Sequence, residues 1–370
     1  MTPHALIRTL TPLLVAAGLI ATPAMAQPDW EQRHRDGLAA IVQQWLDAPH
    51  GDYGSLSFTY WNKDGAVPED CAACHSQPGF LDHLGANGSA PGTVNAPAAI
   101  NAPIGCASCH TEAAHALDEV TFPSGVSLTG LGPDATCMTC HQGRHSGDDV
   151  AAATEGLDAD TVSADLGFLN IHYGIAAAVI GGADLRGGYQ YPGQSYAGTS
   201  THVPSANTCT DCHDPHSTQV IDTEGCMSCH RGVENLRDIR MQHGDFDGDG
   251  DISGGIHAEI TGVQAQLDTA IRTYASEVIG TPIGYAPGRF PYFFTDSNGN
   301  GVIDEDEATF PNRYQSWTPR LLKAAYNYQA VKKDPGGYVH NPRYLLQLLH
   351  DSLADLGTVV ALDLGANRRP

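Results

Sequence analysis

Apolar residues recur at helical spacing over the last third of the chain. Between residues 256 and 278 they fall at steps of three and four residues, which predicts one amphipathic helix. A second helix is predicted at 318–332, with Pro319 in its first turn, where a missing N–H breaks no hydrogen bond. Asp-Pro-Gly-Gly at 334–337 ends this helix, and a third helix is predicted at 342–356. We therefore expect an α-helical module at the C-terminus.

The rest of the chain carries weaker signals. A helix is predicted at about 35–47, and the aromatic run at 189–196 predicts a small β-hairpin. The sequence holds 41 Gly and 23 Pro but only 16% charged residues, a composition typical of loop-rich proteins. We expect a mostly α and irregular architecture with few short strands.

The first 26 residues resemble a signal peptide. Arg8 precedes an apolar stretch at 10–20, and Ala-Met-Ala at 24–26 fits a cleavage site, so the mature chain is expected to begin at Gln27. The alternative, a buried or membrane-anchoring helix, is disfavoured because the stretch is short and contains Pro12. We expect export to the periplasm, the outer membrane or the extracellular space, with no transmembrane span in the mature chain.

The net charge argues against anionic partners. A formal charge of −23 argues against nucleic acid and against anionic membranes, because both attract cationic surfaces. An acidic surface would instead steer the protein to basic docking patches on redox partners.

All ten cysteines fall into five Cys-x-x-Cys-His motifs. In chain order these are Cys71, Cys74 and His75; Cys106, Cys109 and His110; Cys137, Cys140 and His141; Cys209, Cys212 and His213; and Cys226, Cys229 and His230. This spacing is the attachment signature of haem c: two thiols bond the porphyrin and the adjacent His becomes the proximal axial ligand. Zinc sites, redox dithiols and disulfide frameworks do not require a His after every pair.

The motifs therefore predict five covalently attached haem c groups between residues 71 and 230. Haems at this density must pack against each other and supply much of the apolar core. Only 12 residues separate His213 from Cys226, so the fourth and fifth haems are predicted to be close neighbours.

The second axial ligand decides between electron transfer and substrate binding. The chain has 18 His, enough for five distal ligands. The candidates by position in the chain are His216, His172, His202, His115 and His83. Weaker candidates are His145 and His243, whereas His34, His50, His257 and His350 are interpreted as surface or helix residues.

Two Asp-rich loops predict one or two calcium ions. The second loop fits the EF-hand pattern throughout, with Gly301 at position 6. Its expected ligands are Asp296, Asn298, Asn300, Val302, Asp304 and Glu307. The first loop offers Asp245, Asp247, Asp249, Asp251 and Ser253. Its position 12 is Ile256, and Glu259 could substitute; the alternative for both loops is an acidic solvated turn.

The segment at 326–349, YNYQAVKKDPGGYVHNPRYLLQLL, resembles the multihaem cytochromes grouped with pentahaem nitrite reductase and hydroxylamine oxidoreductase. The segments at 122–125, 137–144, 170–173 and 212–216 look like exported polyhaem cytochromes that transfer electrons. The resemblance implies that His340 is a distal haem ligand. No Lys follows any Cys pair, unlike the catalytic haem of the nitrite reductases, and five motifs replace the eight of the hydroxylamine oxidoreductases.

We therefore predict a multihaem cytochrome c with a haem-packed core. Its expected divisions are a signal peptide at 1–26, a lead-in at 27–67, a pentahaem domain at 68–235 and a calcium-loop helical module at 236–370.

The leading hypothesis is an electron carrier with mainly bis-His haems in respiratory electron transfer. A second is a reductase or oxidase of a small nitrogen or sulfur oxyanion at one open haem, where Arg144, His145 and Tyr173 could serve. A third is a subunit of an outer-membrane conduit, docked to a porin, or of a self-assembled haem filament.

Overall fold

The structure is a computed structural model that describes residues 30–221, 223–362, 364 and 366–370. The expected signal peptide lies outside these residues. The chain divides into two compact units between Gln43 and Gln44. The predicted N-terminal helix is present as α1 (Trp30–Leu46), and its residues from 34 to 43 are exposed.

The haem-motif part of the second unit is built from short pieces. Its helices are α2 (Leu56–Thr59), α3 (Glu69–His75), α4 (Gln77–His83), α5 (Glu112–Ala116), α6 (Asp134–Cys140), α9 (Cys209–Cys212) and α10 (Thr223–Cys229). Turns of 3-10 helix lie at η1 (Pro49–Gly51), η2 (Cys106–Ser108) and η3 (Leu236–Asp238). One antiparallel pair, β1 (Glu119–Thr121) and β2 (Ser127–Thr129), joins in the register Val120 to Leu128.

The C-terminal part holds the long helices. They are α11 (Ile256–Tyr274), α12 (Pro319–Lys332) and α14 (Pro342–Leu356), with the short α13 (Gly337–His340) between the last two. A π-helical turn, η4 (Ala275–Ile279), continues α11, and η5 (Phe310–Asn312) precedes α12. The strands β3 (Ile283–Tyr285) and β4 (Phe293–Thr295) pair antiparallel. The three predicted helices are thus confirmed, and the first changes to a π turn after Tyr274.

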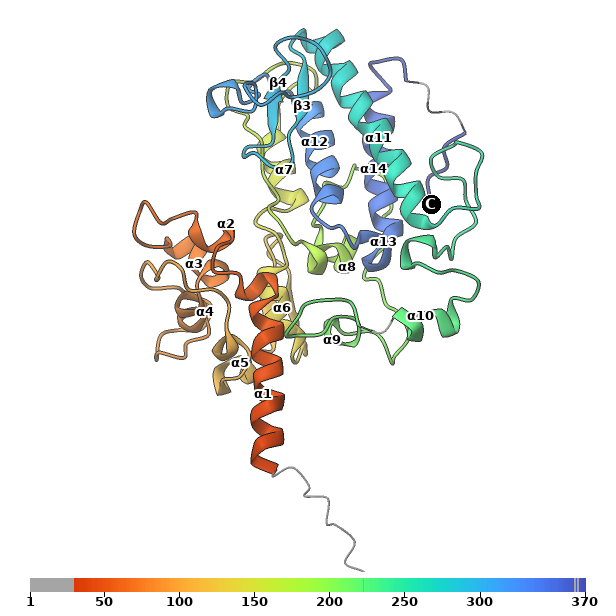
Figure 1. The fold of residues 1–370 in the computed structure, drawn as a ribbon. Helices are drawn as coiled ribbons and strands as arrows, with labels where there is room; N and C mark the ends of the chain where they lie inside the picture. Colours follow the sequence, from red (N-terminus) through yellow and green to blue (C-terminus); the bar gives the residue numbers. More distant parts are fainter. Residues whose placement is uncertain (1–29, 222, 363, 365) are drawn as a thin grey trace, which may run out of the picture. The chain divides into compact units, whose positions relative to one another are not determined.

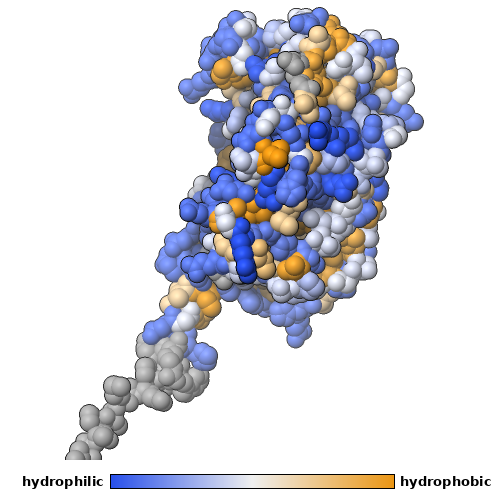
Figure 2. Space-filling model, turned by 90° about the vertical axis from the view of Figure 1, so that its right-hand side faces the viewer, coloured by the Kyte–Doolittle hydropathy of each residue, from blue (hydrophilic) through white to orange (hydrophobic). Residues whose placement is uncertain are grey.

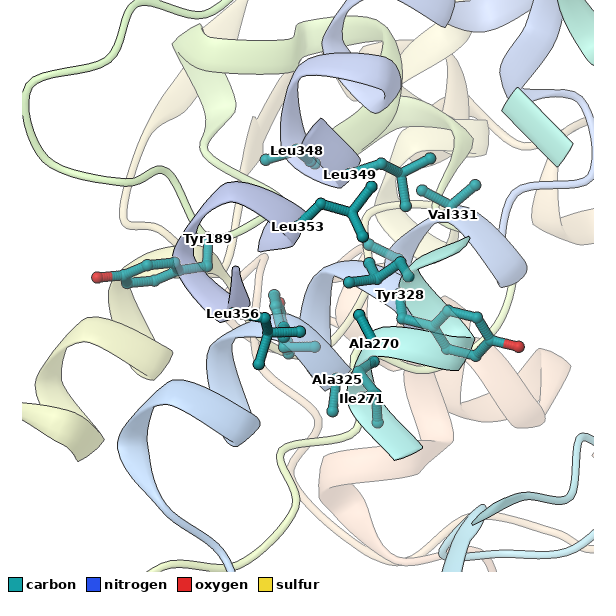
Figure 3. Close-up of a cluster of buried hydrophobic side chains, with 14 of the residues drawn as sticks. Tyr189, Ala270, Ile271, Ala325, Tyr328, Val331, Leu348, Leu349, Leu353 and Leu356 are labelled. Carbon is teal, nitrogen blue, oxygen red and sulfur yellow. The ribbon is translucent and has the colours of Figure 1, made fainter. Parts of the chain in front are cut away.

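The main core lies between these helices. Figure 1 shows α11, α12 and α14 side by side, and α11 packs on both of the others. Buried side chains of all three helices belong to this core, among them Leu349 and Leu353 of α14, Ala325 of α12, and Ala270 and Ile271 of α11 (Figure 3). Each of these side chains is at most 2% exposed, so the three helices share one apolar core.

The segment between the third and fourth haem motifs packs on the same core. It contains α7 (Gly147–Thr154) and α8 (Ala176–Leu185). Ile171, Ile175 and Val179 are at most 2% exposed and belong to the same cluster as α12. The stretch that carries the five haem motifs is therefore anchored on the C-terminal helices through its longest cysteine-free segment.

The predicted hairpin at 189–196 is wrong: no strand forms there among the described residues. The backbone of Tyr189 bonds the side chain of Asn327 instead. Its N–H donates to Asn327 Oδ1 at 2.7 Å, and its carbonyl accepts from Asn327 Nδ2 at 2.9 Å. A buried amide of α12 therefore uses the backbone groups that a hairpin would pair.

Candidate haem sites

Each haem motif forms one helical turn. The N–H of the motif His donates to the carbonyl of the first Cys in four of the motifs, at 2.9 Å for His110 and His213 and 3.0 Å for His141 and His230. His75 is the last residue of α3, which carries both cysteines of its motif. This turn places two thiols three residues apart on one side, with the His directly after them. None of the ten cysteines is in a disulfide in the described chain, and each residue is at least partly exposed, so they fit thioether attachment to a porphyrin.

Four of the five motif histidines face the ring of a second His. The ring centres are 5.8 Å apart for His75 and His172, 6.2 Å for His110 and His216, 6.3 Å for His141 and His50, and 6.0 Å for His230 and His202. An iron–nitrogen bond of about 2 Å on each side of a haem places the centres of two axial imidazoles roughly 6 Å apart. The four pairs therefore have the spacing of bis-His haem ligation.

Hydrogen bonds fix the orientation of three motif histidines. Nδ1 of His75 lies 2.8 Å from the carbonyl of Ser57, and Nδ1 of His141 lies 3.1 Å from that of Gly174. Nδ1 of His213 is 3.2 Å from the carbonyl of Thr218. A carbonyl accepts only from a protonated nitrogen, so Nε2 keeps its lone pair in the neutral ring and can bind a metal.

Electrostatics keeps several of these rings neutral. Burial lowers the pKa of His50, His75 and His141. For His172, burial, with added repulsion from His75 and Arg144, lowers the pKa to about 4. Since only neutral imidazole binds a metal, these shifts favour ligation near neutral pH.

His213 is the motif His without a facing ring at this separation in the described chain. His340 is the remaining distal candidate with a metal-site environment. Its Nδ1 lies 2.8 Å from both carboxylate oxygens of Asp334, an arrangement that leaves Nε2 as the ligand atom. Burial is the main cause that lowers the pKa of His141, and the charges of His213 and His340 add to this effect. Both side chains therefore lie close enough to His141 to act on it.

His83 and His115 do not face a motif His in the part of the chain described. His83 stacks on Phe80 at 6.1 Å, and His115 is exposed on α5. His50 faces the motif residue His141, whereas from the sequence it is interpreted as a surface or helix residue. It lies in the η1 turn ahead of the first motif, and the one signal available was that it precedes every Cys pair.

The third motif lies between the first and the fourth. Helix α6 packs against both α3 and α9. Cys140 Sγ is 3.9 Å from the carbonyl of Ala73, and Cys74 Sγ is 4.0 Å from that of Thr139. The N–H of Cys209 donates to Asp134 Oδ1 at 3.1 Å. The residues that would hold these three haems are therefore in direct contact.

The second Asp-rich loop buries two carboxylates. Asp296 and Glu307 are 4% and 7% exposed. Asp296 accepts from loop N–H groups including that of Gly301, and Glu307 accepts from the N–H groups of Ser297 and Asn298. No Lys, Arg or His forms an ion pair with either carboxylate within the described ranges. Backbone donors and oxygen side chains of this kind suit a hard cation.

The first Asp-rich loop repeats this arrangement with a displaced acid. Glu259 accepts from the N–H groups of Phe246 and Asp247, loop positions 2 and 3, as Glu307 does in its own loop. Carboxylate oxygens of Asp245, Asp247 and Glu259 lie within 4.8 Å of one another. Burial, with repulsion from neighbouring carboxylates, raises the pKa of Asp247. Glu259 also pairs with Arg240 at 2.5 Å, which offsets part of the negative charge.

The surface is largely hydrophilic on the face in view. Figure 2 shows hydrophilic residues over much of the face in view, with apolar residues in small groups. Across the described residues, no helix combines the length and the apolar character that a bilayer crossing requires.

The chain is similar to polyhaem cytochromes of Geobacter sulfurreducens. It is 26% identical to the C-type polyheme cytochrome OmcB of strains DL-1/KN400 and PCA, over 85% of this chain and 47% of that protein. It is 27% identical to the C-type polyheme cytochrome OmcC of strain PCA, over 85% of this chain and 46% of that protein. The chain thus spans about half the length of the curated relatives it matches. No family model and no solved structure matches it.

These relatives support the interpretation as a multihaem c-type cytochrome. They do not confirm the resemblance to the group of nitrite reductase and hydroxylamine oxidoreductase.

Proposed function

We propose that this protein is a pentahaem c-type cytochrome that carries electrons through closely packed, bis-His haems. The observation that carries the proposal is the set of four motif histidines, each facing a second His at 5.8–6.3 Å. The similarity to polyhaem cytochromes over 85% of the chain supports it independently.

Each haem would be held by two thioethers and two imidazoles. The axial pairs in motif order are His75 with His172, His110 with His216, His141 with His50, His213 with His340, and His230 with His202. The fourth pair is proposed because both rings act electrostatically on His141 and both have Nδ1 bonded, which leaves Nε2 as the ligand atom. A haem with two protein ligands exchanges electrons and has no free position for a substrate.

The residues considered for an oxyanion site do not gather around an open haem position. Arg144 and Tyr173 both lie at the first motif, whose His75 already faces His172. Arg144 Nη1 is 3.7 Å from Cys71 Sγ, and the ring centre of Tyr173 is 6.1 Å from that of His172. His145 lies 3.6 Å from the carboxylate of Asp149. These positions favour the carrier over the reductase or oxidase, which stays the alternative.

The sequence supports a proposal for the cellular location and the partners. We propose an exported protein in the periplasm or at the outer membrane, which exchanges electrons with redox proteins that carry basic patches. Docking to a porin and self-assembly into a filament are two forms that this exchange could take.

Low-temperature EPR of the oxidised protein, with and without nitrite, tests the proposal. The expected result is five haems per chain by pyridine haemochrome assay, all low-spin, with a spectrum that nitrite leaves unchanged. A high-spin signal from about one haem in five that responds to nitrite would instead establish an open iron and the enzyme alternative.

Calcium binding is a second proposed role, favoured by the matching positions of Glu307 and Glu259. Calcium would neutralise the buried carboxylates and brace the ends of α11 and the β3–β4 pair. We expect calcium to raise the thermal midpoint of the protein and EGTA to lower it. In isothermal titration calorimetry, E307Q should lose one site and E259Q the other. A wild-type protein without heat of binding at millimolar calcium would contradict this role.

A further inference from the structure

Two charged side chains of opposite sign lie beside different haem sites. We infer that Arg144 and Asp334 set the haems of the first and fourth motifs to the high and low ends of the protein's reduction potentials. The inference rests on the proposed electron-carrier function. It gives the row of haems a direction, because electrons settle where the potential is highest.

Asp334 acts on the fourth site through His340. Its side chain is buried at 3% exposure, and both of its oxygens lie 2.8 Å from His340 Nδ1. A carboxylate that accepts a hydrogen bond from the Nδ1–H group makes the imidazole a stronger electron donor to its metal. A stronger donor, together with the negative charge itself, stabilises ferric over ferrous iron and lowers the potential.

Arg144 acts on the first site. Its Nη1 lies 3.7 Å from Cys71 Sγ, and it pairs with no carboxylate among the residues described. Its guanidinium therefore lies beside a thiol that would attach the first haem. A cation at this place disfavours the extra positive charge of ferric iron. It therefore raises the potential of this haem.

Lys333 adds to Arg144 in the same sense. Its Nζ lies 3.2 Å from the ring centre of Tyr173 and 3.9 Å from that of Tyr292. It reaches His172 electrostatically, as Arg144 does. Burial lowers the pKa of Lys333 to about 7, so its charge near neutrality is partial and Arg144 is the stronger contributor. The neighbours Lys333 and Asp334 thus act on different haem sites with opposite signs.

The third motif connects the two ends. Helix α6 contacts α3 of the first motif and α9 of the fourth. In the internal equilibrium one electron passes from ferrous iron at the fourth motif to ferric iron at the first, and no bond or proton changes place. The direction is set by the side chains around the haems and needs no conformational change.

Spectropotentiometric titration of the holoprotein tests the inference. D334N should favour reduction of the lowest-potential haem about tenfold, an upward shift of ~59 mV for a one-electron couple. R144Q should disfavour reduction of the highest-potential haem about threefold, a downward shift of roughly 30 mV, because Arg144 is exposed and partly screened. H172M identifies the wave of the first haem, since Met ligation raises a haem potential.

Matched variants control for general effects. Arg186 bonds Asp148, and the buried Asp351 bonds Arg369, so R186Q and D351N change the same charges at other places. Both should leave the five waves in place. R144K keeps the positive charge and should retain the wild-type potential of the highest wave, even where R144Q is unstable. D334E keeps the negative charge and should retain the wild-type potential of the lowest wave.

Two outcomes overturn the inference: waves that do not move in R144Q and D334N, or shifts that fall on other haems. Both outcomes are distinct from a failure of the proposed function. That failure would show as a high-spin haem, or fewer than five haems, in the wild-type protein before any variant is compared.

Discussion

Residues 190–245 and residues 256–356 are held together by different means. The first stretch carries the fourth and fifth haem motifs, and none of its described residues is a buried apolar side chain. The second has helices of 19, 14 and 15 residues whose leucines and tyrosines are almost fully buried. A chain that buries so little apolar surface cannot offset the entropy of its own ordering. We therefore expect the fold of the first stretch to depend on the haem groups attached to it.

The largest effect should follow from preventing haem attachment. In full-length chain produced without haem maturation, residues 190–245 should lose protection from hydrogen exchange. Residues 256–356 should keep protection in their helices, because their core is made of side chains. Exchange followed by mass spectrometry measures both in one sample. Equal protection of the two stretches without haem would break the comparison.

Substitution in the helical core should have the next largest effect. Leu322 of α12 is 0% exposed, and L322A is expected to cost about 2–5 kcal/mol through lost burial and the cavity left behind. The thermal midpoint should fall while haem stoichiometry and the EPR spectrum stay the same. Val339, which is 51% exposed, provides the matched control V339A with little change.

Asn327 tests how the two parts are coupled. N327A removes the amide that bonds both backbone groups of Tyr189 and leaves them buried without partners, at a cost of about 1–3 kcal/mol. The segment that carries His172 should then exchange faster than α11. Denaturant titration gives the cost, and hydrogen exchange shows where the loosening occurs. Uniform loosening across all helices would show that Asn327 does not couple particular segments.

The smallest effect concerns the ion pair of Asp160 with Arg320. The hydrogen bond from Arg320 is the main cause that lowers the pKa of Asp160. Its contribution to stability is therefore present above the unfolded-state pKa, about 3.9, and is lost as the pH falls through the lower folded value. D160N should cost below about 1 kcal/mol at pH 7, since Asp160 is partly exposed, and less at pH 2, where part or all of the carboxylate is protonated. Urea titrations at the two pH values check the sign.

The sequence predicted best where a structure repeats locally. The three C-terminal helices follow from apolar periodicity, and the five haem turns follow from residue identity. The hairpin prediction failed because the backbone of Tyr189 pairs with Asn327, a residue far away in the sequence.

Local sequence patterns also do not predict that His50 faces His141, and the reason is the same. Any His that the fold brings to the far side of a porphyrin can be a distal ligand, and its neighbours in sequence need carry no signal. The ring separations supply this information, which the sequence lacks.

The most direct test of the account is EPR of H50A beside the wild-type protein, with H257A as control. The ring of His257 packs edge-to-face with Tyr338 and faces no motif His among the described residues. The account predicts five low-spin haems in the wild type and in H257A, and one new high-spin signal, about a fifth of the total, in H50A. A fully low-spin H50A with five haems would contradict the proposed pairing of His50 with His141.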